Sequence, residues 1–247
     1  MPNDIGNRLN VIAGPCSVEN HEQVTKTAYE LAQIGIRVFR AGLWKPRSNY
    51  GKFEGVGDKG IAWLQEIQEK YEMEVMTEVI LPSHVEKALK AGIDMLWIGA
   101  RTSVNPFMIS ELTQALAGVD VPIFIKNPMC PDINLWEGCI DRFYHAGIKN
   151  LSVIHRGFCL EYNLPYRNKP LWNLAEQLRL DFPEIPIFCD PSHISGNKTL
   201  IPEICTKAKE LSYDGLFIEV HYQPEQALTD ARQQITPCEL KTLLHSI

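Results

Sequence analysis

Short apolar runs alternate with longer amphipathic segments along the whole chain. Each apolar run is nearly continuous in hydrophobic character and follows turn-forming residues, which is typical of parallel strands buried on both faces. The segments between the runs have the length and spacing of helices. The apolar runs predict strands within residues 9–14, 36–42, 73–79, 94–100, 121–127, 150–155, 185–190 and 214–220. The other segments predict helices at residues 21–34, 59–71, 83–91, 107–118, 134–146, 170–180 and 199–211, with helical material continuing to the end.

This alternation predicts an α/β fold. Eight strand–helix units in about 250 residues fit a closed (β/α)₈ TIM barrel, and a doubly wound open sheet is the alternative. Glycines in the sequences AGI (91–93 and 146–148) and YDG (213–215) stand just before strands and are plausible helix C-caps. The chain has no Pro/Ser-rich linker and no change of composition, so we expect a single barrel domain over residues 1–247.

Composition limits the partners and the compartment. The net charge of −6 argues against a general polyanion binder, so we expect no nucleic-acid partner and only local positive patches. No apolar run approaches the ~20 residues needed to span a bilayer, and the N-terminus lacks a signal-peptide layout. The seven cysteines are scattered without a CxxC pair. This pattern predicts free thiols in a reducing cytoplasm and no membrane association.

Polar side chains follow the predicted strands where the chain leaves the sheet, the face that carries chemistry in a barrel. Cations stand at the ends of the second, fourth, fifth and sixth strands, as Arg40, Arg101, Lys126 and Arg156. Each alone has a simpler interpretation as a salt bridge at a strand terminus. Too few acids share these positions to pair all the cations, so we expect a bound anion. The number of cations favours a substrate with several anionic groups, such as a sugar phosphate or phosphoenolpyruvate.

A second set of residues has the chemistry of metal ligands. Cys16, His193, Glu219 and Asp230 form a mixed sulfur, nitrogen and oxygen set that suits a divalent transition metal such as Mn, Fe, Co or Zn. A lone cysteine is more often a small buried hydrophobe, and Asp230 has the alternative of a helix cap or solvated loop acid. His193 follows the seventh strand on a predicted loop. In a closed barrel the first, seventh and eighth strands are neighbours, so the set could converge.

Several motifs resemble one family. They are AGPCSVE, FRAGLWKPRS, GARTSVNPF, IHRGF, CDPSHISG and IEVHYQPEQALTDARQQ. Together they are similar to 3-deoxy-7-phosphoheptulonate (DAHP) synthase of the compact type I-beta branch, and in particular to the synthase half of bifunctional forms fused to chorismate mutase. The resemblance runs from about residue 9 to 240. It implies a (β/α)₈ barrel that condenses phosphoenolpyruvate with erythrose 4-phosphate and releases phosphate, the first step of the shikimate pathway.

The resemblance also implies roles for individual residues. The metal ligands would be Cys16, His193, Glu219 and Asp230. Erythrose 4-phosphate would bind at Lys45, Pro46, Arg47 and Ser48, where relatives commonly have Thr in place of Ser48. Lys45 is the candidate proton donor, provided that neighbouring cations lower its pKa. The phosphoenolpyruvate site would comprise Arg40, Lys45, Glu78, Ala100, Arg101, Lys126 and Arg156.

Two rival functions stay open at this point. One is 3-deoxy-octulosonate 8-phosphate synthase, which uses arabinose 5-phosphate and carries a KANRS loop where this chain has KPRS. The other is a non-catalytic barrel that binds an anion or a chorismate mutase. Because no regulatory segment precedes the barrel and the chain ends where a fused mutase would begin, we expect a synthase without fused regulation. The resemblance further implies a homodimer or homotetramer and allows a separate chorismate mutase as partner.

Overall fold

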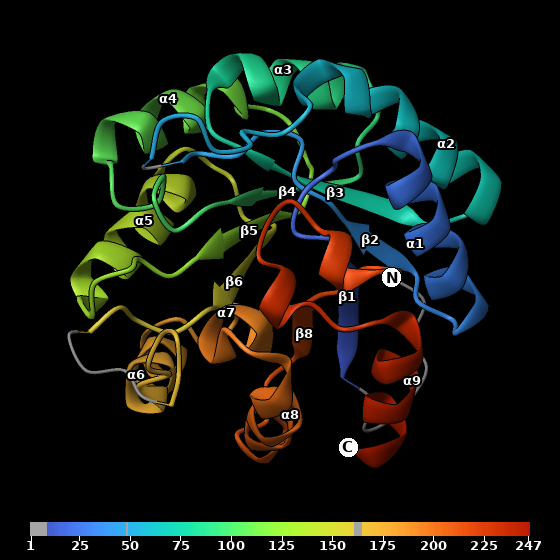
Figure 1. Ribbon diagram of the computed structural model, residues 1–247. Helices are drawn as coiled ribbons and strands as arrows, with labels where there is room; N and C mark the ends of the chain where they lie inside the picture. Colours follow the sequence, from blue (N-terminus) through green and yellow to red (C-terminus); the bar gives the residue numbers. More distant parts are fainter. Residues whose placement is uncertain (1–8, 48, 161–164) are drawn as a thin grey trace.

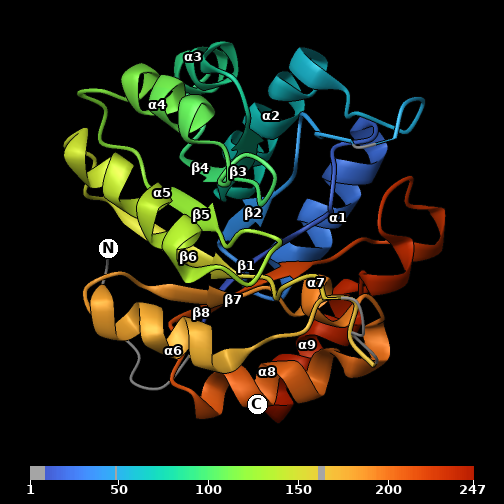
Figure 2. The ribbon, with the colours of Figure 1, turned by 90° about the vertical axis from the view of Figure 1, so that its left-hand side faces the viewer.

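The computed structural model describes residues 9–47, 49–160 and 165–247. Eight parallel strands pair in sequence order, and β8 pairs with β1 to close the barrel. The open-sheet alternative is therefore wrong. Helices surround the strands as an outer ring (Figures 1 and 2). The strands are β1 (Asn10–Gly14), β2 (Val38–Arg40), β3 (Glu74–Val79), β4 (Met95–Ile98), β5 (Ile123–Lys126), β6 (Leu151–His155), β7 (Ile187–Cys189) and β8 (Gly215–Glu219).

The helices follow the predicted order with two additions. The long ones are α1 (His21–Gln33), α2 (Ile61–Tyr71), α3 (Pro82–Lys90), α4 (Pro106–Ala115), α5 (Ile133–His145), α6 (Trp172–Asp181), α8 (Ile201–Glu210) and α9 (Pro237–Ser246). The first addition is α7 (Pro191–Ser195), directly after β7. The second is a set of 3₁₀ turns, η1 (Gly57–Gly60), η2 (Lys198–Leu200), η3 (Pro224–Gln226) and η4 (Ala231–Gln233). The segment after β8 is therefore irregular before it becomes helical.

Local chemistry explains where the elements begin and end. Asn20 caps α1 by accepting from the backbone N–H of Gln23, and Thr236 forms a capping box with Glu239 at α9. Gly92 and Gly147 take left-handed φ values of 72° and 83° after α3 and α5, which confirms these two predicted caps. The third predicted cap is wrong. Gly215 begins β8, and Ser212 takes the left-handed conformation before it, with φ 55°.

Two hydrophobic cores support the barrel. The larger one fills the space between the strands and the surrounding helices. The smaller one fills the interior of the barrel with the buried side chains Ile12, Met76, Trp97, Phe124, Ile154, Phe188 and Phe217, against which the partly buried Val38 of β2 and Met95 of β4 pack. Side chains at the strand ends therefore lie directly above this apolar interior core. None of the helices in the described ranges is long and apolar enough to cross a membrane.

Candidate active site

Buried cations lie directly on the aromatic floor of the barrel. The Arg40 guanidinium carbon is 4.1 Å from the ring centroid of Phe217 and 5.0 Å from that of Trp97. The Lys126 ammonium nitrogen is 4.9 Å from the same Phe217 ring. Arg40 is fully buried and Lys126 is nearly so. Charges in such a place require anionic partners, because burial in an apolar environment disfavours an isolated ion.

Carboxylates supply part of that compensation. Arg40 Nη2 lies 3.3 Å from Glu219 Oε1, Lys126 Nζ lies 2.9 Å from Asp190 Oδ2, and Lys45 Nζ lies 3.6 Å from Glu78 Oε2. Two of the four predicted strand-end cations, Arg40 and Lys126, are therefore paired with carboxylates, as is Lys45. The acids come from the ends of other strands, which the barrel closure brings opposite the cations.

Arg40 nevertheless keeps unused donors. Its Nε and Nη1 are buried and have no hydrogen-bond partner. A buried guanidinium with two unsatisfied nitrogens is costly unless a ligand accepts from them. We therefore still expect a bound anion at Arg40, although the ion pair with Glu219 neutralises part of the guanidinium charge.

Arg156 lies beyond β6 on the same face of the barrel. Its Nη1 donates to Gly157 O at 3.2 Å and to Asn168 Oδ1 at 3.0 Å. The pKa of Arg156 is lowered to about 10, chiefly by burial, with nearby Arg167 and Arg101 adding to this effect and Asp190 opposing it. Ala100 and the exposed Arg101 directly follow β4 and reach this region. All the predicted strand-end cations therefore gather at one end of the barrel.

The segment Lys45–Arg47 extends from the end of β2. Lys45 is mostly buried, and Arg47 Nε donates to Phe53 O at 3.0 Å within its own loop. Pro46 is half-buried between them, and Ser48 lies outside the described residues. Burial would lower the pKa of Lys45, but Cys16 and Glu78 outweigh that effect and the pKa is raised. The expected lowering of this pKa is therefore wrong, and Lys45 is held in its ammonium form.

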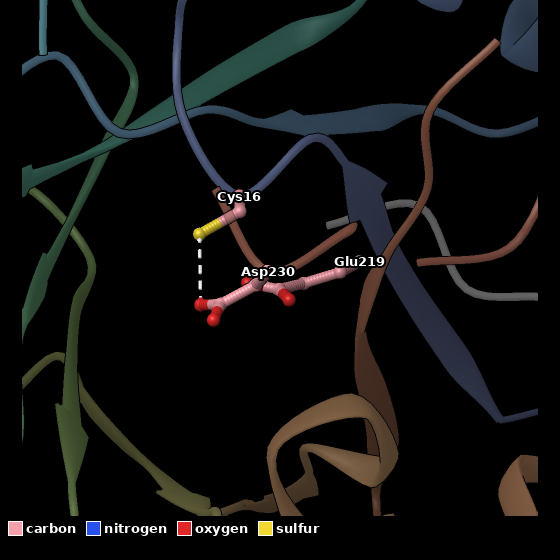
Figure 3. A group of neighbouring side chains, drawn as sticks. All are labelled: Cys16, Glu219 and Asp230. Carbon is pink, nitrogen blue, oxygen red and sulfur yellow. Dashed lines mark hydrogen bonds between the residues drawn. The ribbon is translucent and has the colours of Figure 1, made fainter. Parts of the chain in front are cut away.

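The residues of metal-ligand type converge beside the buried cations, since Glu219 contacts Arg40 and Asp190 lies between Lys126 and His193. One donor atom from each of Cys16, Glu219 and Asp230 lies within 4.8 Å of the others, and Cys16 Sγ is 3.4 Å from Asp230 Oδ2 (Figure 3). Cys16 follows β1, Glu219 ends β8, and Asp230 lies in the irregular segment after β8. Closure of the barrel between β1 and β8 produces this proximity, since Gly14 pairs with Glu219.

His193 stands at the border of this group. Its Nε2 is 3.9 Å from Asp230 Oδ2, and its Nδ1 is 3.8 Å from Glu219 Oε1. The Nδ1 atom also lies 2.8 Å from Asp190 Oδ2, without the alignment of a hydrogen bond. The residue belongs to α7 and not to a loop as predicted, because Asp190 caps this short helix by accepting from the backbone N–H of His193.

The electrostatics of this group favour a cation among its side chains. Burial and the charge of Glu219 raise the pKa of the Cys16 thiol to about 12. Burial opposes ionisation of Asp230, but His193 and Arg167 outweigh it and lower its pKa. A thiol, two carboxylates and an imidazole are a donor set that divalent transition metals accept, and a cation would stabilise the thiolate that burial disfavours. The residues present therefore fit a metal ion.

Three polar residues of the site did not figure in the sequence prediction. Arg167 contacts Asp230, Asn168 contacts Arg156, and the buried Gln233 donates to Glu219. Arg167 and Asn168 lie between β6 and α6, far along the chain from any strand end. The adjacent Arg-Asn pair in the sequence YRNKP was the available signal, but nothing in the sequence indicates which face it reaches.

Comparison with known proteins reveals similarity over the whole described barrel. The profile of the DAHP synthetase I family matches residues 3–247. A phospho-2-dehydro-3-deoxyheptonate aldolase of Thermotoga maritima is 31% identical over 232 residues, which cover 94% of this chain and 67% of the relative. A 2-dehydro-3-deoxyphosphooctonate aldolase of Desulfotalea psychrophila is 27% identical over 264 residues, covering 97% of this chain and 88% of the relative.

Solved structures give the same result. The crystal structure of the Thermotoga maritima DAHP synthase matches with a TM-score of 0.87 and 29% identity, covering 98% of this chain and 68% of that one. A truncated form of 3-deoxy-D-arabino-heptulosonate 7-phosphate synthase from the same organism matches with a TM-score of 0.83 and 27% identity, covering 98% and 86%.

Proposed function

The chain belongs to the DAHP synthetase I family, and we propose that it condenses phosphoenolpyruvate with erythrose 4-phosphate and releases inorganic phosphate. The observation that carries this proposal is the juxtaposition of two groups in one barrel opening. One group is the buried cations, of which Arg40 has two unused donors, and the adjacent group is Cys16, Glu219 and Asp230. The first group suits a polyanionic substrate, and the second suits a metal that an aldehyde oxygen can approach.

Phosphoenolpyruvate would bind on the cation side. Arg40 offers two free donors to its carboxylate or phosphate, Lys126 adds a buried point charge, and Arg156 with the exposed Arg101 reaches the phosphate from the rim. Guanidinium groups bind such oxygens in bidentate fashion. Ala100 leaves room for the backbone to approach the ligand, and Glu78 holds Lys45 beside it.

A divalent metal of the Mn, Fe, Co or Zn class would be held by Cys16, His193, Glu219 and Asp230. When bound, such an ion polarises a carbonyl oxygen as a Lewis acid or lowers the pKa of a water. The ligand set already stands within reach of Lys45, because the charges of Cys16 and Glu219 both act on the Lys45 ammonium group.

The chain's own residues then position the reaction. The enol carbon of phosphoenolpyruvate attacks the aldehyde carbon, and the aldehyde oxygen takes a proton, for which Lys45 is the proposed donor. Water adds to the resulting cationic carbon and loses a proton, which gives a hydroxyl group beside the phosphate ester on that carbon. The bond from the carbon to the phosphate oxygen then breaks, phosphate leaves with the electron pair, and the hydroxyl loses its proton to form the ketone. Arg40, Lys126 and Arg156 stabilise negative charge throughout and hold the two substrates in reactive geometry. The raised pKa keeps Lys45 in the protonated state that a donor needs, without the lowering by neighbouring cations on which the sequence argument relied.

The segment Lys45–Arg47, together with Ser48, would bind the aldose. Pro46 fixes φ between the two cations and limits how far they diverge. The Pro-Arg pair also separates this chain from the octulosonate branch, whose 27%-identical relative is less similar than the DAHP relative. We therefore place erythrose 4-phosphate ahead of arabinose 5-phosphate as substrate.

Comparing the two aldoses tests this assignment. Phosphate release from phosphoenolpyruvate should be fast with erythrose 4-phosphate and at least about tenfold slower with arabinose 5-phosphate at equal concentration, since a one-carbon difference in a fitted site changes the barrier by about 1–3 kcal/mol. A preference for arabinose 5-phosphate would assign the octulosonate reaction. No phosphate release with either sugar would leave the non-catalytic barrel as the better description.

Assembly and location complete the proposal. The proposed assembly is a homodimer or homotetramer, as the family resemblance implies. A separate chorismate mutase is the proposed regulatory partner. All seven cysteines are free thiols, in agreement with a cytoplasmic location. Light scattering of the pure chain at micromolar concentration should give two or four times the 28.0 kDa of one chain, and a monomer would contradict self-association.

A further inference from the structure

Arg167 fixes two of the proposed metal ligands from outside. Its Nη1 donates to Asp230 Oδ1 at 3.0 Å and to Gln233 Oε1 at 2.6 Å. Gln233 is 1% exposed and donates from Nε2 to Glu219 Oε2 at 2.6 Å. One guanidinium therefore orients Asp230 directly and Glu219 through an amide.

The same contacts leave the other carboxylate oxygens turned toward the proposed metal. Asp230 Oδ2 is the oxygen that lies 3.4 Å from Cys16 Sγ and 3.9 Å from His193 Nε2. Glu219 Oε1 is the oxygen that lies 3.8 Å from His193 Nδ1. Of the two carboxylates beside Cys16 in Figure 3, Asp230 thus has one oxygen held by Arg167 and the other directed toward Cys16. Glu219 has one oxygen held by Gln233, and its other oxygen lies between His193 and Arg40, whose Nη2 donates to it at 3.3 Å.

Asn168, the next residue, reaches the cation side. Arg156 Nη1 donates to its Oδ1 at 3.0 Å, and its Nδ2 donates to the backbone oxygen of His193 at 2.7 Å. The residue is 3% exposed. Two adjacent side chains therefore contact opposite sides of the site, Arg167 the metal side and Asn168 the phosphoenolpyruvate side.

The backbone of this pair is fixed against α7. The N–H groups of Arg167 and Asn168 donate to Ser195 O and Ile194 O, both at 3.1 Å. Gly196 ends α7 with a left-handed φ of 66°, and a Cβ there would lie 2.4 Å from Arg167 Cβ. The pair therefore packs on a position that only glycine can fill, and its two side chains cannot move independently of α7.

A simple surface salt bridge is the alternative interpretation of Arg167, whose side chain is 46% exposed. Such pairs contribute little to stability. A group that orients a metal ligand acts differently, because its loss weakens metal affinity without unfolding the protein. We propose that Arg167 and Asn168 are positioning residues, Arg167 for the metal ligands and Asn168 for Arg156, so that one short segment aligns both sides of the site. This inference rests on the proposed function.

Cobalt titration of the intact chain tests the first half. Co²⁺ bound by a cysteine thiolate gives a charge-transfer absorption in the near ultraviolet, which reports binding without turnover. Arg167→Met should weaken Co²⁺ affinity by about 10- to 100-fold, the usual effect of losing an outer partner of a metal ligand. Arg167→Lys retains one donor and should give an intermediate value. Lys169→Met is the matched control, since it removes the same charge from an exposed position two residues away and should bind as the unaltered chain does.

Steady-state kinetics at saturating metal test the second half. Asn168→Ala should raise KM for phosphoenolpyruvate by about tenfold, because Arg156 loses one of its two oxygen acceptors. Gln233→Met should lower Co²⁺ affinity as Arg167→Met does, and it serves if the Arg167 variants fail to fold.

The outcomes separate this inference from the proposed function. Unchanged Co²⁺ affinity in Arg167→Met and Gln233→Met, or an unchanged KM in Asn168→Ala, would overturn the inference alone. Absence of the thiolate band in the unaltered chain would overturn the metal ligand set itself, and the inference with it.

Discussion

The two sides of the barrel opening are built in different ways. On the cation side, Arg40 and Lys126 are the last residues of β2 and β5, so the register of the sheet places them. On the metal side only Glu219 ends a strand. Cys16 lies beyond β1, His193 lies in α7, and Asp230 takes a left-handed φ of 52° in an irregular segment. The core of the fold therefore positions one side, and connecting segments position the other.

This difference has an energetic consequence. The cations are buried as ion pairs, and removal of one partner leaves an uncompensated buried charge that costs about 3–5 kcal/mol. Three of the proposed metal ligands, Cys16, His193 and Asp230, sit on segments outside the strands, whereas Glu219 ends β8 and pairs with Arg40. Substitutions of the buried cations should therefore affect stability and binding together, whereas substitutions of Cys16, His193 or Asp230 should affect metal binding with little loss of stability.

Removing the Cys16 thiol should have the largest effect on turnover. Cys16→Ala deletes a proposed ligand, and we expect a loss of more than about 100-fold in metal-dependent phosphate release, beyond the loss expected from an outer partner. The urea midpoint should change little. Cys139→Ala removes the same atom from an equally buried site in α5 and should keep full turnover. Undiminished activity in Cys16→Ala would remove this residue from the metal set.

Replacing Arg40 should lower the stability of the fold and substrate binding together. Arg40→Met leaves Glu219 buried without its 3.3 Å partner, so we expect a loss of about 3–5 kcal/mol in the free energy of unfolding, measured by urea denaturation. KM for phosphoenolpyruvate should rise as well. The exposed Arg37 provides the control, because Arg37→Met should alter neither quantity. A variant with native stability and reduced turnover would contradict the coupling of the two effects.

Displacing the Glu78 carboxylate should have a smaller effect on turnover than removing the Cys16 thiol. A Cβ on Gly99 would lie 2.0 Å from Glu78 Oε1, so Gly99→Ala must displace this carboxylate from Lys45. We expect kcat/KM to fall by about 10- to 100-fold, the effect of a misplacement of about 1 Å. In α5, Gly138 has no atom within 4 Å of the same position, and Gly138→Ala should leave turnover intact. Equal activities of the two variants would show that Glu78 does not position Lys45.

The smallest effect near neutral pH is expected from His155, through the pH dependence of the free energy of unfolding. His155 is fully buried, donates to Pro170 O and accepts from Tyr213 OH, and burial lowers its pKa to about 4. Between about pH 6.5 and 4 the unfolded chain takes up a proton that the folded chain refuses, so stability falls as pH decreases through this window, by roughly 3 kcal/mol. His155→Gln should flatten this slope, whereas His145→Gln, on the exposed face of α5, should not. Identical slopes would contradict a neutral buried His155.

The sequence predicted the fold well because each strand is a continuous apolar run. The predicted second strand is longer than β2, which spans only Val38–Arg40. The prediction was too long because Ala41 and Leu43 are buried even though the chain has already left the sheet. It also missed α7, although the Asp-Pro pair at 190–191 is a readable start signal for a helix.

The site could be predicted only in part from sequence. Strand ends indicated the cations, because parallel strands all finish at one edge. Their pairing with Glu78, Asp190 and Glu219 depends on which strands face each other across the barrel, and spacing along the chain does not encode this. The positions of Arg167 and Asn168 in the site could not be predicted for the same reason, since a long connection brings them to α7.

Phosphate release with and without added metal ion is the most direct test of the proposed metal-dependent reaction. The purified chain is treated with a chelator, assayed with phosphoenolpyruvate and erythrose 4-phosphate, and assayed again after Mn²⁺ is added. Activity should fall to background with chelator and return with Mn²⁺, because Cys16, Glu219 and Asp230 would hold the ion beside the substrates. Full phosphate release in the presence of excess chelator would contradict the account.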